Sequence, residues 1–146
     1  MVRVFISNIS NLPDALDNQE MMEGLPDERK EKIKRIKIAH GRKQSLGAGL
    51  LLKHAQTTLG EGLCYNLSHS GDYVICAASN FSVGCDIEKI KEAPINVAKK
   101  YFCEREVEYL LGSPEARKND DFFRLWTIKE SYLKMTGEGL QVPLNC

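Results

Sequence analysis

The sequence predicts an α+β fold. Segments typical of strands and segments typical of helices are mixed along the chain, and the connections between the β segments are short. With 146 residues the chain can form one compact domain or two small halves, and 42% hydrophobic with 27% charged residues is ordinary for a globular protein.

The first part of the chain is expected to contain one strand, two helices and one short extended segment. In order, these are a strand in MVRVFISNIS, a polar loop over 8–24, a helix that opens at Pro26-Asp27, a helix over about 42–59 and an extended segment over 64–67. Ile33 and Ile36 are three residues apart, and leucines recur at helical spacing in the second helix. The sequence GEG then breaks that helix.

An apolar hairpin is expected in the middle of the chain. Residues 73–78 and 81–88 are rich in apolar and β-branched types, and residues 79–80 would form the turn. Asp86 and Glu88 lie two residues apart in the second segment. A strand would therefore point both carboxylates to the same face, where they repel one another.

The rest of the chain is predicted to be mainly helical. Helices are expected near 94–102, 104–111 and 120–136, with GSP as a loop signal between the last two. Gly137 and Gly139 stop the last helix. The remaining LQVPLNC looks like the start of a strand without a partner, so we expect the second half to lack the strands that would cover its helices.

The composition argues against several classes of protein. The formal net charge is zero, which gives no overall field toward nucleic acid or membranes, and no apolar run is long enough to span a bilayer. The N-terminus lacks the features of a signal peptide. Five cysteines without a C-x-x-C spacing argue against a disulfide framework or a zinc site, and they favour the reducing cytoplasm.

The first cluster that could carry chemistry is the pair Asp86 and Glu88. Two carboxylates on one face supply oxygen ligands for a hard cation such as Mg²⁺, which would cancel their repulsion. The alternative is an exposed strand end with two solvated acids, because the D-x-E spacing is common by chance.

The second cluster lies on the last helix. Apolar residues surround most of this helix, which predicts that it is mostly buried. Glu130 and Lys134 are four residues apart on one face, with Trp126 one turn earlier. A buried carboxylate needs a partner or a metal. The alternative is a surface ion pair that contributes little.

The third cluster is basic. Eight Lys or Arg and one Glu occur between Arg29 and Lys43, either as a solvated helix face or as a clamp for phosphates. Ser68, His69 and Ser70 could join such a clamp, because a hydroxyl and an imidazole both donate to phosphate oxygens. The alternative for His69 is a loop histidine bonded to the backbone. No glycine-rich phosphate loop of the G-x-x-x-x-G-K-[ST] kind is present.

The ordered motifs NLSHSG, GCDIEK and LWTIKESYLK resemble those of the Sfp-type 4′-phosphopantetheinyl transferases. The resemblance covers about 26–144. It implies two similar α+β halves, a pseudo-dimer, divided here into 1–80 and 81–146, with the active site between them. It also implies that coenzyme A is split at its pyrophosphate and that 4′-phosphopantetheine moves to a serine of an acyl or peptidyl carrier protein. Adenosine 3′,5′-bisphosphate would be the other product.

The resemblance also implies roles for the acidic residues. By matching motif positions, Asp86, Glu88 and Glu130 would hold Mg²⁺, with Mn²⁺ as an alternative that also suits octahedral oxygen ligands. Glu130 would in addition deprotonate the carrier serine, directly or through water. The carrier could belong to fatty-acid, polyketide or nonribosomal-peptide biosynthesis.

The same resemblance assigns the coenzyme A phosphates to basic and polar residues. Lys134 would bind a pyrophosphate oxygen and act in catalysis, and Ser68 and His69 would contact the phosphates. Arg29 and Lys32 match basic positions that bind the 3′-phosphate.

The sequence departs from the family pattern in two places. No G-K-P element precedes NLSHSG, and family members continue past the last motif with several strands, whereas this sequence stops at Cys146. We therefore expect a second half that is truncated at its C-terminus. The alternative to an enzyme is a truncated, non-catalytic relative that binds coenzyme A or a carrier protein. Self-association is a further expectation, because it could cover the exposed helices.

Overall fold

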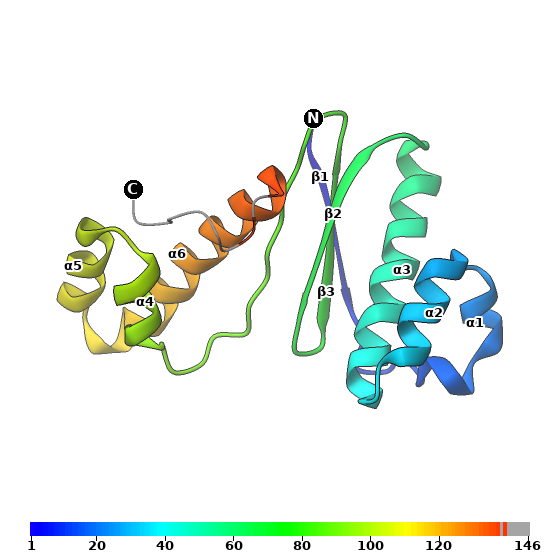
Figure 1. The fold of residues 1–146 in the computed structure, drawn as a ribbon, viewed down its shortest axis with the longest axis horizontal. Helices are drawn as coiled ribbons and strands as arrows, with labels where there is room; N and C mark the ends of the chain where they lie inside the picture. Colours follow the sequence, from blue (N-terminus) through cyan, green and yellow to red (C-terminus); the bar gives the residue numbers. More distant parts are fainter. Residues whose placement is uncertain (138, 140–146) are drawn as a thin grey trace.

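A computed structural model describes residues 1–137 and 139 of the chain. In order, its elements are β1 (Arg3–Asn8), a 3-10 helix (Ala15–Asp17), α1 (Gln19–Glu23), α2 (Asp27–Arg35), α3 (Ala39–Leu59), β2 (Cys64–Ser70), β3 (Tyr73–Ser79), α4 (Ile95–Tyr101), α5 (Glu104–Gly112) and α6 (Glu115–Thr136). Helices α1 to α3 lie on one side of a small sheet, and α4 to α6 lie on the other side (Figure 1). The mixture of helices and strands agrees with the predicted fold class.

The sheet has three antiparallel strands in the order β1-β3-β2. Ser70 is paired with Tyr73, so only Gly71 and Asp72 form the turn between β2 and β3. Gly71 has a φ of +53°, which glycine adopts without the clash that a side chain would cause. The central strand β3 is buried from Val74 to Ser79, because both of its edges are paired and both of its faces are covered.

Helix α3 forms the main core against one face of the sheet. Ala48, Leu51 and Ala55 on this helix pack with Val74 and Cys76 of β3. The opposite side of α3 is also apolar, so Leu46 packs with Leu25 and with Ile33 of α2 in a second cluster. The basic helix α2 is thereby held beside α3 through a single fully buried side chain, Ile33.

The three C-terminal helices form a core of their own. Phe102, Leu110, Phe122 and Phe123 are its large buried side chains. The Phe122 ring stacks on Trp126, with ring centroids 6.1 Å apart and an interplanar angle of 10°. Such aromatic contacts contribute beyond the area that they bury.

The expected hairpin over 73–78 and 81–88 is wrong in its second strand. The partner of β3 on that side is β2, and residues 81–88 are not a strand. Since β1 and β2 occupy both edges of β3, residues 81–88 lie across the face of the sheet instead. There Val83, Cys85 and Ile87 cover Ile75 and Ala77.

Four further expectations need correction or fall outside the described residues. The polar loop over 8–24 contains the 3-10 helix and α1, and α6 begins at Glu115 instead of near residue 120. Helix α6 is not mostly buried, because Ile128 is 62% and Tyr132 is 54% exposed. The expected final strand in LQVPLNC lies outside the described residues.

Two other features concern the architecture as a whole. The three-stranded sheet is the only one within residues 1–137, so the division into two similar halves stays a prediction. Over the same residues, no helix combines the length and the apolar character that a membrane crossing requires.

Candidate active site

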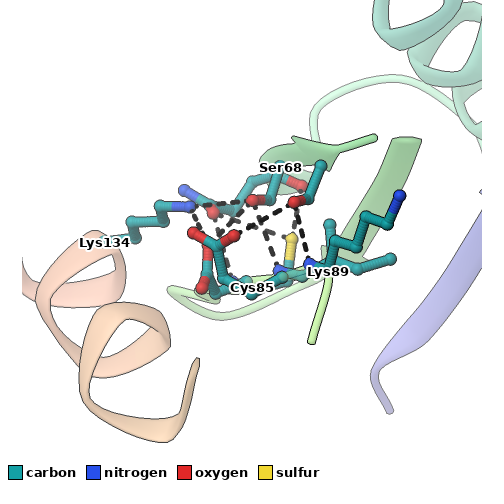
Figure 2. A network of polar contacts seen from close by, with 9 residues as sticks. Ser68, Cys85, Lys89 and Lys134 are labelled. Atoms are coloured by element: carbon teal, nitrogen blue, oxygen red, sulfur yellow. Dashed lines mark hydrogen bonds and ion pairs between the residues drawn. The ribbon is translucent and has the colours of Figure 1, made fainter. Parts of the chain in front are cut away.

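The segment 84–89, which carries Asp86 and Glu88, is attached to β2 by side chains. Alternate residues of a strand point to the same side, and three such residues bind backbone N–H groups of this segment. Asn66 Oδ1 accepts from Cys85 N (3.1 Å), Ser68 Oγ from Ile87 N (3.4 Å) and Ser70 Oγ from Lys89 N (2.9 Å). Each bond joins residues 19 positions apart, so the segment runs parallel to β2 (Figure 2).

Asp86 lies at the centre of a charged network. Its side chain is 5% exposed, and its Oδ1 accepts hydrogen bonds from Ser68 Oγ at 2.8 Å and from Lys134 Nζ at 2.6 Å. Lys134 Nζ also donates to Ser68 Oγ at 3.0 Å, and Figure 2 shows the lysine reaching this point from α6. One residue of each of the three sequence motifs therefore takes part in the same network.

Glu88 has a simpler environment. Its Oε2 accepts a hydrogen bond of 3.0 Å from Ser70 Oγ. Because Asp86 and Glu88 are bonded by Ser68 and Ser70, which lie two apart on β2, both carboxylates are held on the β2 side of their segment. The same-face arrangement that the sequence predicted is thus present, although the segment is not a strand.

Helix α6 approaches the carboxylate segment very closely at Gly84. A Cβ atom at this position would lie 1.8 Å from the backbone oxygen of Ser131 and 2.7 Å from the backbone nitrogen of Met135. Only glycine leaves room for this contact. The first residue of GCDIEK therefore allows Lys134 to come within hydrogen-bond distance of Asp86.

Glu130 lies on α6 one turn before Lys134. Partial burial raises the pKa of its carboxyl group, and the negative charge of Asp86 raises it further. Lys134 lowers this pKa, and Glu88 contributes a smaller upward shift. The three acidic residues predicted as metal ligands therefore act on one another electrostatically.

His69 is influenced electrostatically by both this network and the basic helix. Its ring remains partly exposed, but partial removal from water lowers its pKa, and the positive charges of Lys134 and Lys32 lower it further. Lys32 of α2 and Lys134 of α6 thus both contribute positive potential at the end of β2.

A pocket of about 530 Å³ lies beside α2 and α3. Arg29 and Lys32, the two basic residues predicted to bind a phosphate, both line it. Lys53 of α3 and Tyr65 of β2 line it as well, and sequence reasoning had assigned them no role. The lining therefore offers three positive charges, the one negative charge of Glu28 and an aromatic side chain, whereas the three predicted metal ligands lie outside it.

The acidic residues fit a divalent cation by their chemistry. Across the described part of the chain, no three His, Cys, Asp or Glu side chains form a finished set of ligands, and Lys134 is the charged partner of Asp86. Asp86 Oδ2, however, is buried and has no hydrogen-bond partner among the described residues. A buried carboxylate oxygen without a partner is unfavourable, and a hard cation with oxygen ligands would provide one.

Sequence reasoning missed the contacts that three residues make in the site, although it named Ser70 as a possible part of a phosphate clamp. Asn66 and Ser70 belong to NLSHSG, where alternation along a strand would have placed them with Ser68. Gly84 begins GCDIEK, but its contact is with the backbone of α6, which is far away in the sequence. No local signal predicts such a contact.

Comparison with known proteins finds similarity to a single family. Residues 82–146 match the sequence profile of the 4′-phosphopantetheinyl transferase superfamily. The chain is 46% identical over 81 residues to the 4′-phosphopantetheinyl transferase gsp of Aneurinibacillus migulanus, which covers 56% of this chain and 34% of that protein. It is 42% identical over 81 residues to the 4′-phosphopantetheinyl transferase Sfp of Bacillus subtilis (strain 168). This match covers 56% of this chain and 36% of that protein.

A more distant relative shows the same resemblance. The chain is 36% identical over 90 residues to the L-aminoadipate-semialdehyde dehydrogenase-phosphopantetheinyl transferase of Pongo abelii, and the match covers 29% of that protein. Together with the three motifs, these matches show that part of the chain is similar to the 4′-phosphopantetheinyl transferase superfamily, with relatives of the Sfp type. The matched part of the chain spans about a third of the length of these curated relatives.

Proposed function

We propose that the protein transfers 4′-phosphopantetheine from coenzyme A to a serine of an acyl or peptidyl carrier protein, with Mg²⁺ as cofactor and adenosine 3′,5′-bisphosphate as the second product. The observation that carries this proposal is the network of Ser68, Asp86 and Lys134. These residues belong to three separate motifs, and their side chains are within hydrogen-bond distance of one another.

The acidic residues would hold the metal ion. Asp86, Glu88 and Glu130 supply carboxylate oxygens, which Mg²⁺ prefers. A bound Mg²⁺ would neutralise the pyrophosphate and stabilise negative charge that builds up on the transferred phosphoryl group. The unpartnered Asp86 Oδ2 supports this assignment.

Glu130 is proposed as the general base. The hydroxyl oxygen of the carrier serine would form a bond to the phosphorus that bears pantetheine, and the bond from this phosphorus to the bridging pyrophosphate oxygen would break. The serine proton would pass to the Glu130 carboxylate, directly or through water. The raised pKa of Glu130 supports this role, because a carboxylate with a higher pKa is a stronger base.

Basic residues on both sides of β2 would bind the phosphates. Lys134 would move from Asp86 to a pyrophosphate oxygen, which offers its ammonium group an equivalent negative partner. Ser68 is bonded to Lys134, His69 follows it on β2, and Arg29 and Lys32 line the pocket where the 3′-phosphate would bind. In this proposal the substrate would lie between residues 1–80 and the motifs of 81–146, in keeping with the proposed division into two halves.

Mass spectrometry of a carrier protein tests this function. The full chain is incubated with coenzyme A, Mg²⁺ and a panel of apo acyl and peptidyl carrier proteins, and the carrier is expected to gain the mass of one phosphopantetheine. Chelation of the metal with EDTA should prevent this gain. If no carrier of the panel is modified while Sfp modifies the same carriers, the proposal is wrong.

The variant Asp86→Ala tests the site. It should abolish transfer, because it removes a metal ligand and releases Lys134. The free energy of unfolding should change by only about 1 kcal/mol, since Lys134 is 30% exposed and can turn toward solvent. The exposed Asp72→Ala serves as a matched control that should keep its activity. Substantial transfer by Asp86→Ala would exclude the metal assignment.

A further inference from the structure

Ser68 and Ser70 make the same pair of hydrogen bonds, two residues apart on β2. Each serine donates to a carboxylate 18 positions later in the chain, which is Asp86 for Ser68 and Glu88 for Ser70. Each also accepts the backbone N–H of the residue that follows this carboxylate. The repeat means that the spacing of the two hydroxyls along β2 sets the spacing of the two carboxylates.

The Ser70 hydroxyl takes part in two hydrogen bonds, one as acceptor and one as donor. Its oxygen accepts the Lys89 N–H at 2.9 Å, and its own hydrogen is directed to Glu88 Oε2 at 3.0 Å. A serine that only anchored the backbone would need the first bond alone. The second bond fixes the direction in which the Glu88 carboxylate points.

Glu88 depends on Ser70 more than Asp86 depends on Ser68. Asp86 is also held by Lys134, and its side chain is almost fully buried. Within residues 1–137, Glu88 has no ion pair, and Ser70 donates its one side-chain hydrogen bond. Without this hydroxyl, a glutamate side chain with three rotatable bonds would be free to sample several rotamers.

We propose that Ser70 is a positioning residue that orients the Glu88 carboxylate for cation binding, as Ser68 does for Asp86. This inference rests on the metal site of the proposed function and adds Ser70 to it, a residue that the sequence suggested only as a possible part of a phosphate clamp. Hydrogen-bond partners of metal ligands commonly change metal affinity by about ten- to a hundredfold when they are removed.

Ser70→Thr and Ser70→Val form the matched pair that tests this role. Both side chains are β-branched and suit a strand, and they differ only in a hydroxyl against a methyl group. The control is Ser82→Val, which makes the same change at an exposed serine near the segment. Urea unfolding of all three variants shows that each is folded.

The measurement is the affinity of the full chain for Mn²⁺ in the presence of coenzyme A, followed as free Mn²⁺ by electron paramagnetic resonance and corrected with a protein-free titration. Ser70→Val should bind Mn²⁺ at least about tenfold more weakly than the wild type. Ser70→Thr and Ser82→Val should bind like the wild type. In Glu88→Gln, the further change of Ser70 to Val should have little additional effect, because the two residues act as one unit.

The outcomes separate the two proposals. If the wild type binds Mn²⁺ and Ser70→Val binds it equally well, the role of Ser70 is overturned while the proposed function stands. Equal losses in Ser70→Thr and Ser70→Val would also overturn it, because the hydroxyl would then be irrelevant. If the wild type binds no Mn²⁺ with coenzyme A present, the proposed metal site is wrong, and the role of Ser70 is wrong with it.

Discussion

Individual residues of the site have more than one partner. Ser68 binds a backbone amide, a carboxylate and an ammonium group, and Lys134 neutralises Asp86 where the proposal places a cation. A lysine at this position keeps a nearly buried carboxylate from being left without a counter-charge. The arrangement explains how acidic residues can be held close together in the folded chain before any cation binds.

Glu130 should give the protein a pH-dependent stability. Its pKa in the folded state is raised above the value of 4.5, so the folded protein binds this proton more tightly than the unfolded chain does. The resulting stabilisation is present below pH 4.5 and is lost as the pH rises through the raised pKa. The variant Glu130→Gln has no ionisable group at this position, so it does not lose this stabilisation as the pH rises. Its free energy of unfolding should therefore increase relative to the wild type as the pH rises from below 4.5 to neutrality.

Urea titrations of both proteins across this pH range check the prediction. The relevant quantity is the difference between the two free energies of unfolding, because contributions from other carboxylates cancel in it. A difference that does not vary with pH would show that Glu130 has an ordinary pKa in the folded protein.

Lys32 offers a second prediction for a single residue. It lines the pocket beside α3, whereas its neighbour Lys30 is paired with Asp27 and lies outside that lining. Lys32→Ala should weaken coenzyme A binding by about ten- to a hundredfold, since a charge-assisted hydrogen bond contributes about 1.5–3 kcal/mol. Lys30→Ala removes the same charge and should have a much smaller effect. Isothermal titration calorimetry measures the coenzyme A affinity of both variants. Equal losses of affinity would indicate that the two lysines act only through the general positive potential and that Lys32 makes no specific contact with coenzyme A.

At the scale of elements, the site depends on how closely α6 lies against the segment 84–89. Figure 1 shows the C-terminal end of α6 beside the segment that follows β3. The rest of α6 packs into the separate aromatic core, where Lys129 also forms an ion pair of 2.8 Å with Glu106 of α5. One helix thus belongs to the C-terminal core and also delivers Glu130 and Lys134 to the sheet.

Gly84→Ala should separate these two elements. The new methyl group would lie 1.8 Å from the Ser131 oxygen, so α6 must move away by more than 1 Å to restore a normal contact. We expect a loss of about 1–3 kcal/mol in the free energy of unfolding and a large loss of transfer activity, because Lys134 and Glu130 move with the helix.

Gly112→Ala is the matched control for this change. Nothing lies within 4 Å of a Cβ atom at Gly112, and this residue is the last of α5. The control should be neutral or slightly stabilising. Urea unfolding and the carrier assay measure both variants. Full activity in Gly84→Ala would show that the close contact is not needed for the site.

At the scale of the whole molecule, the described helices belong to two separate regions of hydrophobic core. One lies between the sheet and α1 to α3, and the other lies among α4 to α6. The segment 84–89 packs on the free face of the sheet and contacts α6 through Gly84, so it links the two. The proposed site lies at this segment, between the two core regions. The proposed substrate would therefore bind between them.

Phe122→Ala tests the C-terminal core. The Phe122 side chain is 1% exposed and stacks on Trp126, so its removal should cost about 3–5 kcal/mol. Trp126 is the single tryptophan of the chain, and its fluorescence therefore reports unfolding of this core. Ile128→Ala on the same helix removes a side chain that is 62% exposed and should change stability by less than about 0.5 kcal/mol. Similar losses in both variants would contradict the described packing.

The sequence by itself determined the mixed fold class, most helices and three of the residues that meet at the site. Helical periodicity identified α2, α3 and α6, and the three ordered motifs identified Ser68, Asp86 and Lys134 as a group. These signals are readable because periodicity and motif chemistry are properties of neighbouring residues.

Only the tertiary structure decided which strand pairs with β3, where residues 81–88 go, and how Gly84, Ser70 and Asn66 serve the site. An apolar, β-branched segment such as 81–88 suits a strand and the face of a sheet equally well. The choice depends on whether the edges of β3 are already occupied, and β1 comes from the far end of the chain to occupy one of them. Contacts between distant segments depend on the three-dimensional packing of both, so they cannot be derived from either segment alone.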